Sequence, residues 1–349
     1  MDIDCDPSPL SNLYSTIYVL CSSLIGIKVG LRVNFIMDIY NITGKTLSAV
    51  KVKPFRLEKD IQKLVEDNID RLFDYELVKS EFKVGTFRLD TLCFDKQNNS
   101  FVIIEYKKDK NFSVIDQGFS YLSTVFDNKS DLILEYQEKK GKNLKRDSLD
   151  WSQTKVLFIS PSFSIYQIES INFKDLPIEL FEIKQYENNT ITLHRHKKRT
   201  TSTSINDISK SDVIQKVKKE VRIYTEEEHL NGRKEGNKSL PKSNPIVREL
   251  YFKYKDTIIN TFDDVEVRFN KYEVALWVKR PFLYFYLGKD ILKIWFNLKM
   301  GKLDDPKNIC RDVSKVGHWG VGDYELNVKD EKNFEYVFSL IRQTYEHNL

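Results

Sequence analysis

Apolar side chains recur at helical spacing in the first half of the chain. Between residues 57 and 72 they occupy positions 57, 61, 64, 65, 69 and 72, which predicts an amphipathic helix that begins after Pro54. The same period within 113–126 predicts a second helix. Short apolar runs at 131–136 and 155–160 are typical of buried strands. This part of the chain therefore alternates helices with strands.

Further elements complete the first half. A hairpin is expected in 81–95 and 101–108, a helix around 162–172, and a second hairpin formed by 179–186 and 190–195. Strands interleaved with helices predict an α/β fold, in which helices flank a mixed sheet.

The last hundred residues change to a period of two. Alternating apolar positions predict four half-buried antiparallel strands, around 264–269, 273–279, 282–288 and 291–297. Helices are expected near 246–261 and 331–345. We therefore predict a smaller α+β domain with an antiparallel sheet, whose core contains the aromatic residues Trp277, Phe282, Tyr284, Phe285, Tyr286, Trp295 and Phe296.

Changes in polarity divide the chain of 349 residues, a length that suits two domains. Residues 37–195 form the predicted α/β domain, 196–243 a polar and partly helical linker, and 244–349 the C-terminal domain. Residues 1–36 are expected to be a leader or a misassigned extension, with Met37 as the natural start. Their apolar run, 13–27, is shorter than the roughly 20 residues that span a bilayer, so a weak membrane anchor is the minor alternative.

Composition narrows the function only slightly. A net charge of +4 is too small to identify a nucleic-acid partner by itself. The four cysteines are scattered along the chain, which argues against a zinc ribbon or a disulfide scaffold. Scattered cysteines fit a reducing compartment, and we expect a cytoplasmic protein.

Candidate chemistry lies on the hairpin that contains Asp90, Glu105 and Lys107. If Asn98 and Asn99 form a two-residue turn, Asp90 faces Lys107, and Glu105 is the diagonal neighbour of Asp90 on the same face. Two carboxylates that share a cation, with an ammonium group beside them, are the groups that metal-assisted phosphodiester hydrolysis requires. An exposed Glu–Lys ion pair at a strand end explains the spacing about equally well.

Several neighbouring residues favour the catalytic interpretation. Magnesium prefers oxygen ligands and keeps several waters, so Asp90, Glu105 and the backbone carbonyl of Tyr106 are a sufficient predicted ligand set for Mg²⁺, with Mn²⁺ as a substitute. Lys107 would orient or activate a water, or stabilise the developing charge. Other candidates lie on the predicted helices and are Glu58, Gln117 and Tyr121, the last two one helical turn apart.

These residues resemble the motifs of the PD-(D/E)XK superfamily, the restriction-endonuclease-like nucleases, and the helical pattern resembles their RecB and NucS-type branches. The resemblance implies that Asp90 and Glu105 bind metal, that Lys107 is catalytic, and that Glu58 is the helix-borne acid. It also implies that Gln117 and Tyr121 line the site. The proline that often precedes the first aspartate is replaced by Leu89.

A closer resemblance extends from Met37 to the C-terminus. Segments such as FVIIEYKKDKNFSVIDQGFSYL and DWSQTKVLFISPSF are similar to bacterial and archaeal proteins that join this nuclease-like domain to a C-terminal domain of unknown function. The resemblance implies the restriction-endonuclease-like fold, a mixed sheet flanked by helices, and a nuclease activity. It does not imply a substrate.

The leading hypothesis is a Mg²⁺-dependent nuclease, with DNA as the first candidate substrate and a role in defence or repair. The C-terminal domain would recognise substrate or a protein partner, and a homodimer is a possible assembly. No membrane partner is expected. The alternative is a non-catalytic nucleic-acid-binding or protein-interaction module that retains the nuclease fold. RNA as the substrate, the strandedness of the substrate and its sequence specificity stay open.

Overall fold

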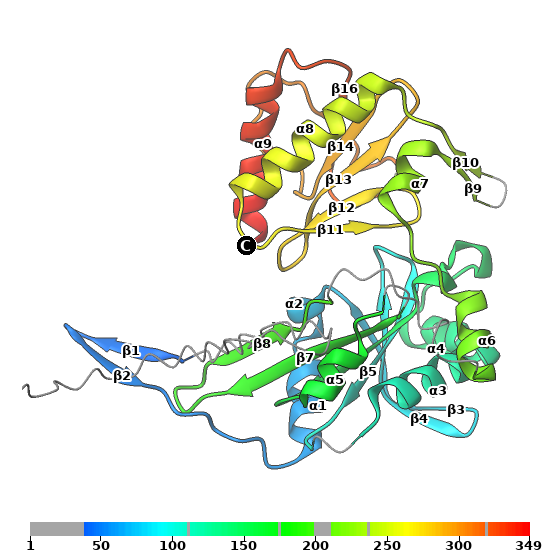
Figure 1. The fold of residues 1–349 in the computed structure, drawn as a ribbon, viewed down its shortest axis with the longest axis vertical. Helices are drawn as coiled ribbons and strands as arrows, with labels where there is room; N and C mark the ends of the chain where they lie inside the picture. The colour runs from blue at the N-terminus through cyan, green and yellow to red at the C-terminus, as the bar shows by residue number, and fades with distance from the viewer. Residues whose placement is uncertain (1–37, 110–111, 174–175, 199–210, 236–237, 318–319) are drawn as a thin grey trace, which may run out of the picture. The chain divides into compact units, whose positions relative to one another are not determined.

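The computed structural model describes residues 38–109, 112–173, 176–198, 211–235, 238–317 and 320–349 (Figure 1). The expected leader, 1–36, lies outside these ranges. The chain divides into two compact units, Met1–Lys51 and Val52–Leu349. In the first unit, β1 (Tyr40–Thr43) and β2 (Thr46–Ala49) form an antiparallel hairpin.

The second unit begins with a six-stranded mixed sheet in the order β3-β4-β5-β6-β7-β8 (Figure 1). Strands β5, β6 and β7 run parallel to one another, and the other neighbouring pairs are antiparallel. The predicted α/β class with a mixed sheet is confirmed. The strands are β3 (Glu76–Val84), β4 (Phe87–Asp95), β5 (Ser100–Tyr106), β6 (Lys155–Ser160), β7 (Ile178–Gln185) and β8 (Ile191–Arg195).

Helices cover both faces of this sheet because its central strands are apolar on both sides. One core packs the sheet against α3 (Val114–Asp127), α4 (Lys129–Lys140) and α6 (Asp212–Glu220) (Figure 1). The other packs it against α1 (Glu58–Glu66) and α2 (Ile69–Phe73). Every residue of β5 is buried, so its side chains alternate between the two cores. The short helix α5 (Ile165–Ser170) precedes β7.

Three sequence predictions in this region were wrong. Residues 131–136, predicted as a strand, lie within α4, where Leu132 and Tyr136 are buried one helical turn apart. The predicted helix over 57–72 is interrupted at Asn68 and forms α1 and α2. The hairpin expected in 81–95 and 101–108 has two strands in its first part instead of one. These are β3, which begins at Glu76, and β4, which begins at Phe87.

Part of the predicted linker packs against the first core. Its described residues include α6, as expected from its helical composition, and Ile214 and Val217 of α6 are buried against α3. Hydrophobic burial, rather than a change in polarity, therefore decides where the first core ends. Residues 226–240 follow as α7 (Glu226–Asn231) and the hairpin β9 (Arg233–Glu235) with β10 (Lys238–Leu240).

The C-terminal domain contains the predicted antiparallel sheet, in the order β11-β12-β13-β14-β16-β15. The helices α8 (Pro245–Thr261) and α9 (Phe334–Asn348) pack against it. The expected aromatic core is confirmed, with Tyr286 the one half-buried member. The strands are β11 (Glu266–Phe269), β12 (Val274–Trp277), β13 (Pro281–Leu287), β14 (Leu292–Phe296), β15 (Arg311–Asp312) and β16 (Tyr324–Val328).

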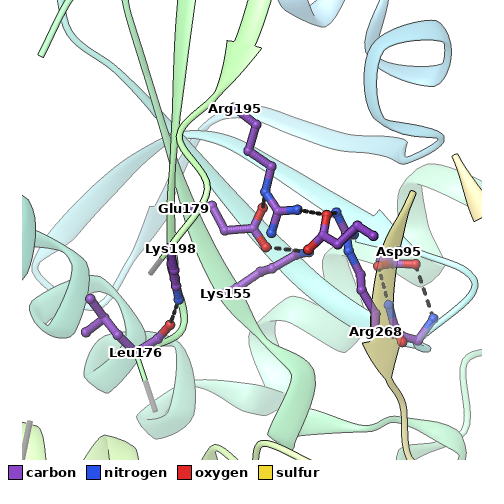
Figure 2. Close-up of polar contacts among 9 residues, drawn as sticks. Asp95, Lys155, Leu176, Glu179, Arg195, Lys198 and Arg268 are labelled. Atoms are coloured by element: carbon purple, nitrogen blue, oxygen red, sulfur yellow. Dashed lines mark hydrogen bonds and ion pairs between the residues drawn. The ribbon is translucent and has the colours of Figure 1, made fainter. Parts of the chain in front are cut away.

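A cluster of ion pairs lies at the start of β6 (Figure 2). The carboxylate of Glu179 lies 3.2 Å from Lys155 Nζ and 3.0 Å from Arg195 Nε. Arg195 also pairs with Glu266, which lies 3.0 Å from Arg268. Each charge has an opposite neighbour, which offsets the cost of partial burial.

Candidate active site

The turn between β4 and β5 sets which residues face each other across the candidate site. The register pairs Asp95 with Ser100 and Thr91 with Ile104. If this register is continued by one residue beyond Thr91 and Ile104, Asp90 lies opposite Glu105. The predicted register, with Asp90 opposite Lys107, was therefore wrong by two residues. Because side chains alternate with period two, both registers leave Asp90 on the same face.

Asp95 explains the correction because its carboxylate holds a longer turn. Its Oδ1 accepts the backbone N–H groups of Gln97 and Asn98 at 2.9 and 3.1 Å. Its Oδ2 accepts the side-chain amide of Asn98 at 2.8 Å. An aspartate that accepts N–H groups two and three residues later stabilises a turn, so four residues connect the strands instead of two.

Asp90 lies within β4 and contacts the end of β5 through its side chain. Its Oδ2 accepts the backbone N–H of Tyr106 at 3.1 Å. The side chain of Tyr106 packs into the core under α1, so this residue contributes its backbone to the site. Asp90 is therefore fixed beside the strand segment that contains Glu105 and Lys107.

Glu105 is almost fully buried, with 3% of its surface exposed, and contacts two of the predicted residues. Its Oε1 lies 2.6 Å from Lys107 Nζ and accepts a hydrogen bond from the Tyr121 hydroxyl at 3.0 Å. Its Oε2 is buried and has no hydrogen-bond partner. An unsatisfied buried carboxylate oxygen is costly, and a bound cation would satisfy it.

Glu58, the first residue of α1, reaches the same cluster from the helix terminus. Its Oε1 lies 3.9 Å from Lys107 Nζ, and its Oε2 accepts the backbone N–H of Lys108 at 3.0 Å. The helix begins here because the Asp60 carboxylate accepts the N–H of Leu57 at 2.9 Å and so caps it. Capping therefore helps to place an acidic side chain beside Lys107.

The two predicted residues on α3 differ in what they contact. Tyr121 reaches Glu105, as described above. Gln117 lies one turn earlier, and its side-chain oxygen is buried without a hydrogen-bond partner. Between them, Gly118 lets the helix approach β7, since a Cβ there would lie 2.4 Å from Cδ1 of Ile178. The structure thus brings together Asp90, Glu105, Lys107, Glu58 and Tyr121. Among the described residues, the side-chain oxygen of Gln117 forms no hydrogen bond.

Burial controls the protonation of the site. It raises the pKa of Glu105 to about 7, and the negative charge of Asp90 adds to the shift. Burial also raises the pKa of Asp90. For Lys107, burial lowers the pKa, but the hydrogen bond and charge of Glu105 outweigh it, so the net shift is upward. The two carboxylates thus disfavour each other's charge, and Lys107 stays an ammonium group at neutral pH.

The donor set fits a hard divalent cation. Asp90 and Glu105 offer carboxylate oxygens, one of them unsatisfied, and their mutual repulsion would be relieved by positive charge. In the described part of the chain, no group of three or more His, Cys, Asp or Glu side chains is arranged to hold a metal.

Sequence reasoning missed a polar network behind Asp90. The side-chain amide of Gln62 in α1 donates to the Asp90 carbonyl oxygen at 2.9 Å and to Glu66 Oε1 at 3.0 Å. The Thr91 hydroxyl also donates to Glu66 and lies 3.2 Å from the Tyr106 hydroxyl. In the sequence, Gln62 is a polar residue next to Ile61, beside the apolar stripe of α1. Nothing else in the sequence indicated that this side chain contacts Asp90.

Fold and site together define the class of protein. It is an α/β protein whose mixed sheet presents two carboxylates on adjacent strands, with Asp90 half-buried within β4 and Glu105 buried near the end of β5, where it pairs with Lys107. No helix in the described ranges is long and apolar enough to cross a membrane.

The chain belongs to the same family as an uncharacterized protein of Haemophilus influenzae. The two are 41% identical over 308 residues, which cover 88% of this chain and 99% of that protein. No protein-family model matches the chain.

Solved structures overlap the chain only in part. A repair endonuclease from Pyrococcus abyssi gives a TM-score of 0.23 at 16% identity, covering 37% of this chain and 49% of that protein. An EndoMS complex with double-stranded DNA gives 0.22 at 11%, covering 42% and 64%. SfsA of Pyrococcus furiosus with Ca²⁺ gives 0.23 at 15%, covering 47% and 77%.

Proposed function

We propose that this protein is a Mg²⁺-dependent nuclease of the PD-(D/E)XK type, with DNA as its first candidate substrate. The observation that carries the proposal is the pair formed by Glu105, which is buried, and Asp90, which is half-buried. Both have raised pKa values, Glu105 has an unsatisfied oxygen, and Lys107 lies beside them. A stable protein keeps such a site only if something offsets the cost of burying it, and binding a cation is the simplest compensation.

Each residue would have a distinct part. Asp90, Glu105 and the carbonyl of Tyr106 would hold Mg²⁺, with Mn²⁺ as a substitute. The bound cation would supply Lewis-acid stabilisation of the negative charge on the phosphate. Lys107, charged because of its raised pKa, would donate a hydrogen bond to a phosphate oxygen or to the attacking water. The raised pKa of Lys107 supports an electrostatic role rather than the role of a general base, because an ammonium group cannot accept a proton.

Glu58, Tyr121 and Gln117 would complete the site. Glu58 lies 3.9 Å from Lys107 and would hold its ammonium group. Tyr121 would fix one oxygen of Glu105 and so orient the other. The unpaired side-chain oxygen of Gln117 would accept a hydrogen bond from substrate or from an ordered water. We also propose that the C-terminal domain recognises substrate or a protein partner, and that two copies pair when both strands of a duplex are cut.

The test is cleavage of single-stranded, double-stranded and branched DNA, and of RNA, with Mg²⁺ or Mn²⁺. Wild-type protein is expected to cut at least one substrate. Asp90→Ala and Lys107→Ala are expected to lose roughly 100- to 1,000-fold in rate, as after loss of one group that stabilises transition-state charge. Lys139→Ala, an exposed lysine of α4, is the matched control and keeps full rate.

The outcomes separate the alternatives. Equal cleavage by wild type and both variants would refute the site assignment. Salt-sensitive DNA binding without turnover under any divalent metal would favour the non-catalytic nucleic-acid-binding module. Neither binding nor turnover would leave a protein-interaction module as the better account.

A further inference from the structure

Asp90 occupies an unusual place in the sheet. In the registers of β3 with β4 and of β4 with β5, strands that are described without a gap, Asp90 pairs with no residue. Its expected neighbour on β3, Glu81, has a φ of 54°, in the left-handed region. Asp90 is thus left out of the paired positions of both ladders, beside an irregularity in β3.

A side chain from another element contacts the peptide of Asp90. Gln62 of α1 is buried, with 4% of its surface exposed, and its amide nitrogen lies 2.9 Å from the Asp90 carbonyl oxygen. The same nitrogen lies 3.0 Å from Glu66 Oε1 and 3.2 Å from Ser80 Oγ. Acceptors on α1, β3 and β4 therefore determine where the Gln62 amide lies. Through this amide, the Asp90 peptide is hydrogen-bonded to α1, the helix that contains Glu58.

We propose that Gln62 is a positioning residue for Asp90. By holding the Asp90 carbonyl on the α1 side of the sheet, it keeps the Asp90 carboxylate on the other side, against the N–H of Tyr106. The carbonyl carbon and Cβ are both bonded to the Cα of Asp90, so a backbone shift that moves this Cα would displace the carbonyl and the carboxylate together. The catalytic part of this inference rests on the proposed nuclease function, but the positioning part does not.

The Gln62→Met variant tests it, because methionine has a similar length and no donor. Hydrogen exchange of the Tyr106 amide, measured by NMR without metal, reports whether Asp90 still accepts that N–H. We expect exchange at Tyr106 to be at least about tenfold faster, with amides at the start of β5 unchanged. We also expect the Mg²⁺ concentration for half-maximal cleavage to rise several-fold, more than the rate falls at saturating Mg²⁺.

Two controls keep the result interpretable. Gln137→Met removes a comparable bond, from a side-chain amide to the Leu144 carbonyl 3.2 Å away, on α4, and should leave both readouts unchanged. If Gln62→Met does not fold, Gln62→Asn keeps an amide that is too short to reach Asp90 and should give the same two changes.

The outcomes distinguish this inference from the proposed function. Unchanged exchange at Tyr106 and an unchanged Mg²⁺ midpoint in a folded Gln62 variant would overturn the positioning role. Faster exchange together with no cleavage by wild type on any substrate would refute the nuclease function and leave the positioning role standing. Faster exchange with a raised Mg²⁺ midpoint supports both.

Discussion

The hydroxyl of Tyr121 in α3 donates a hydrogen bond to Oε1 of Glu105 at the end of β5, over 3.0 Å. This bond links the helix layer to the carboxylate, and it engages the same oxygen that pairs with Lys107. The other oxygen, Oε2, is left without a partner. Two donors on one oxygen thus direct the second toward whatever cation or hydrogen-bond donor enters the site.

Tyr121→Phe should reduce the Mg²⁺ affinity of the site more than it reduces the stability of the fold. Loss of the hydroxyl removes a bond that lowers the pKa of Glu105, so that pKa should rise further and Mg²⁺ affinity should fall. Stability should drop by about 1 kcal/mol, the usual net value of one hydrogen bond. Cleavage titrated with Mg²⁺ and urea unfolding measure the two effects.

Tyr136→Phe is the matched control for that prediction. The Tyr136 hydroxyl donates to Oε2 of Glu76 at 2.9 Å, so the same chemical change is made at a carboxylate outside the site. It should reduce stability by a similar amount and leave the Mg²⁺ titration unchanged. Equal effects of both variants on that titration would contradict a special role for Tyr121.

The pH dependence of the unfolding free energy should reveal the raised pKa of Glu105. Because burial raises its pKa in the folded state from 4.5 to about 7, its contribution is fully present below about pH 4.5 and is lost as pH rises through about 7. The loss amounts to roughly 3 kcal/mol. In metal-free buffer, Glu105→Gln should remove this decline from the unfolding free energy measured between pH 4.5 and 8. Identical pH profiles for the two proteins would contradict the assignment.

Metal binding should have the opposite pH dependence. Cations bind the charged carboxylates and compete with protons, so Mg²⁺ affinity should rise with pH through about 7 as Glu105 ionises. Isothermal titration calorimetry in buffers of different ionisation enthalpy would show proton release on binding near pH 6. Binding without proton release would show that Glu105 is already ionised there.

Asp95 should be important for stability although it lies outside the site. Asp95→Ala leaves two backbone N–H groups and one side-chain amide of the β4–β5 turn without their acceptor, and should cost on the order of 2 kcal/mol. Asp95→Asn keeps an acceptor oxygen and should cost less. Urea unfolding of both variants measures the difference. An equal cost for both would show that the turn does not depend on these bonds.

Gly118→Ala should destabilise the protein, although alanine usually stabilises a helix. A Cβ there would lie 2.4 Å from Cδ1 of Ile178, so Gly118→Ala should push α3 away from β7 and destabilise the protein by about 1–3 kcal/mol. Cleavage should also slow, because α3 contains Tyr121. At Gly317 an added Cβ meets nothing within 4 Å, so Gly317→Ala is the control in thermal unfolding. A more stable Gly118→Ala protein would contradict the prediction.

Much of the fold could be predicted from local patterns. The apolar run of β5 and the amphipathic α3 follow from the sequence pattern. The prediction that β12 and β13 are half-buried was wrong, because residues on both faces of these strands pack into hydrophobic clusters. The segment 131–136 was mistaken for a strand because a short apolar run fits either structure. Packing of Leu132 and Tyr136 against the sheet decides that it is helical.

The sequence by itself determined which residues could do chemistry and on which face of the hairpin they lie. Alternation along a strand placed Asp90 and Glu105 on one face in either register, because a shift of two residues preserves the face. The direct opposition of the two carboxylates came from the turn held by Asp95. Such a turn depends on side-chain hydrogen bonds that a hydrophobic pattern does not encode.

Only the tertiary structure decided what surrounds those residues. Gln62 and Tyr121 reach the candidate site across 28 and 16 positions of sequence, from helices on opposite faces of the sheet. Periodicity describes neighbours along one element, but contacts between elements depend on how the chain closes around its cores. Burial, and with it the raised pKa of Glu105, arises from that closure.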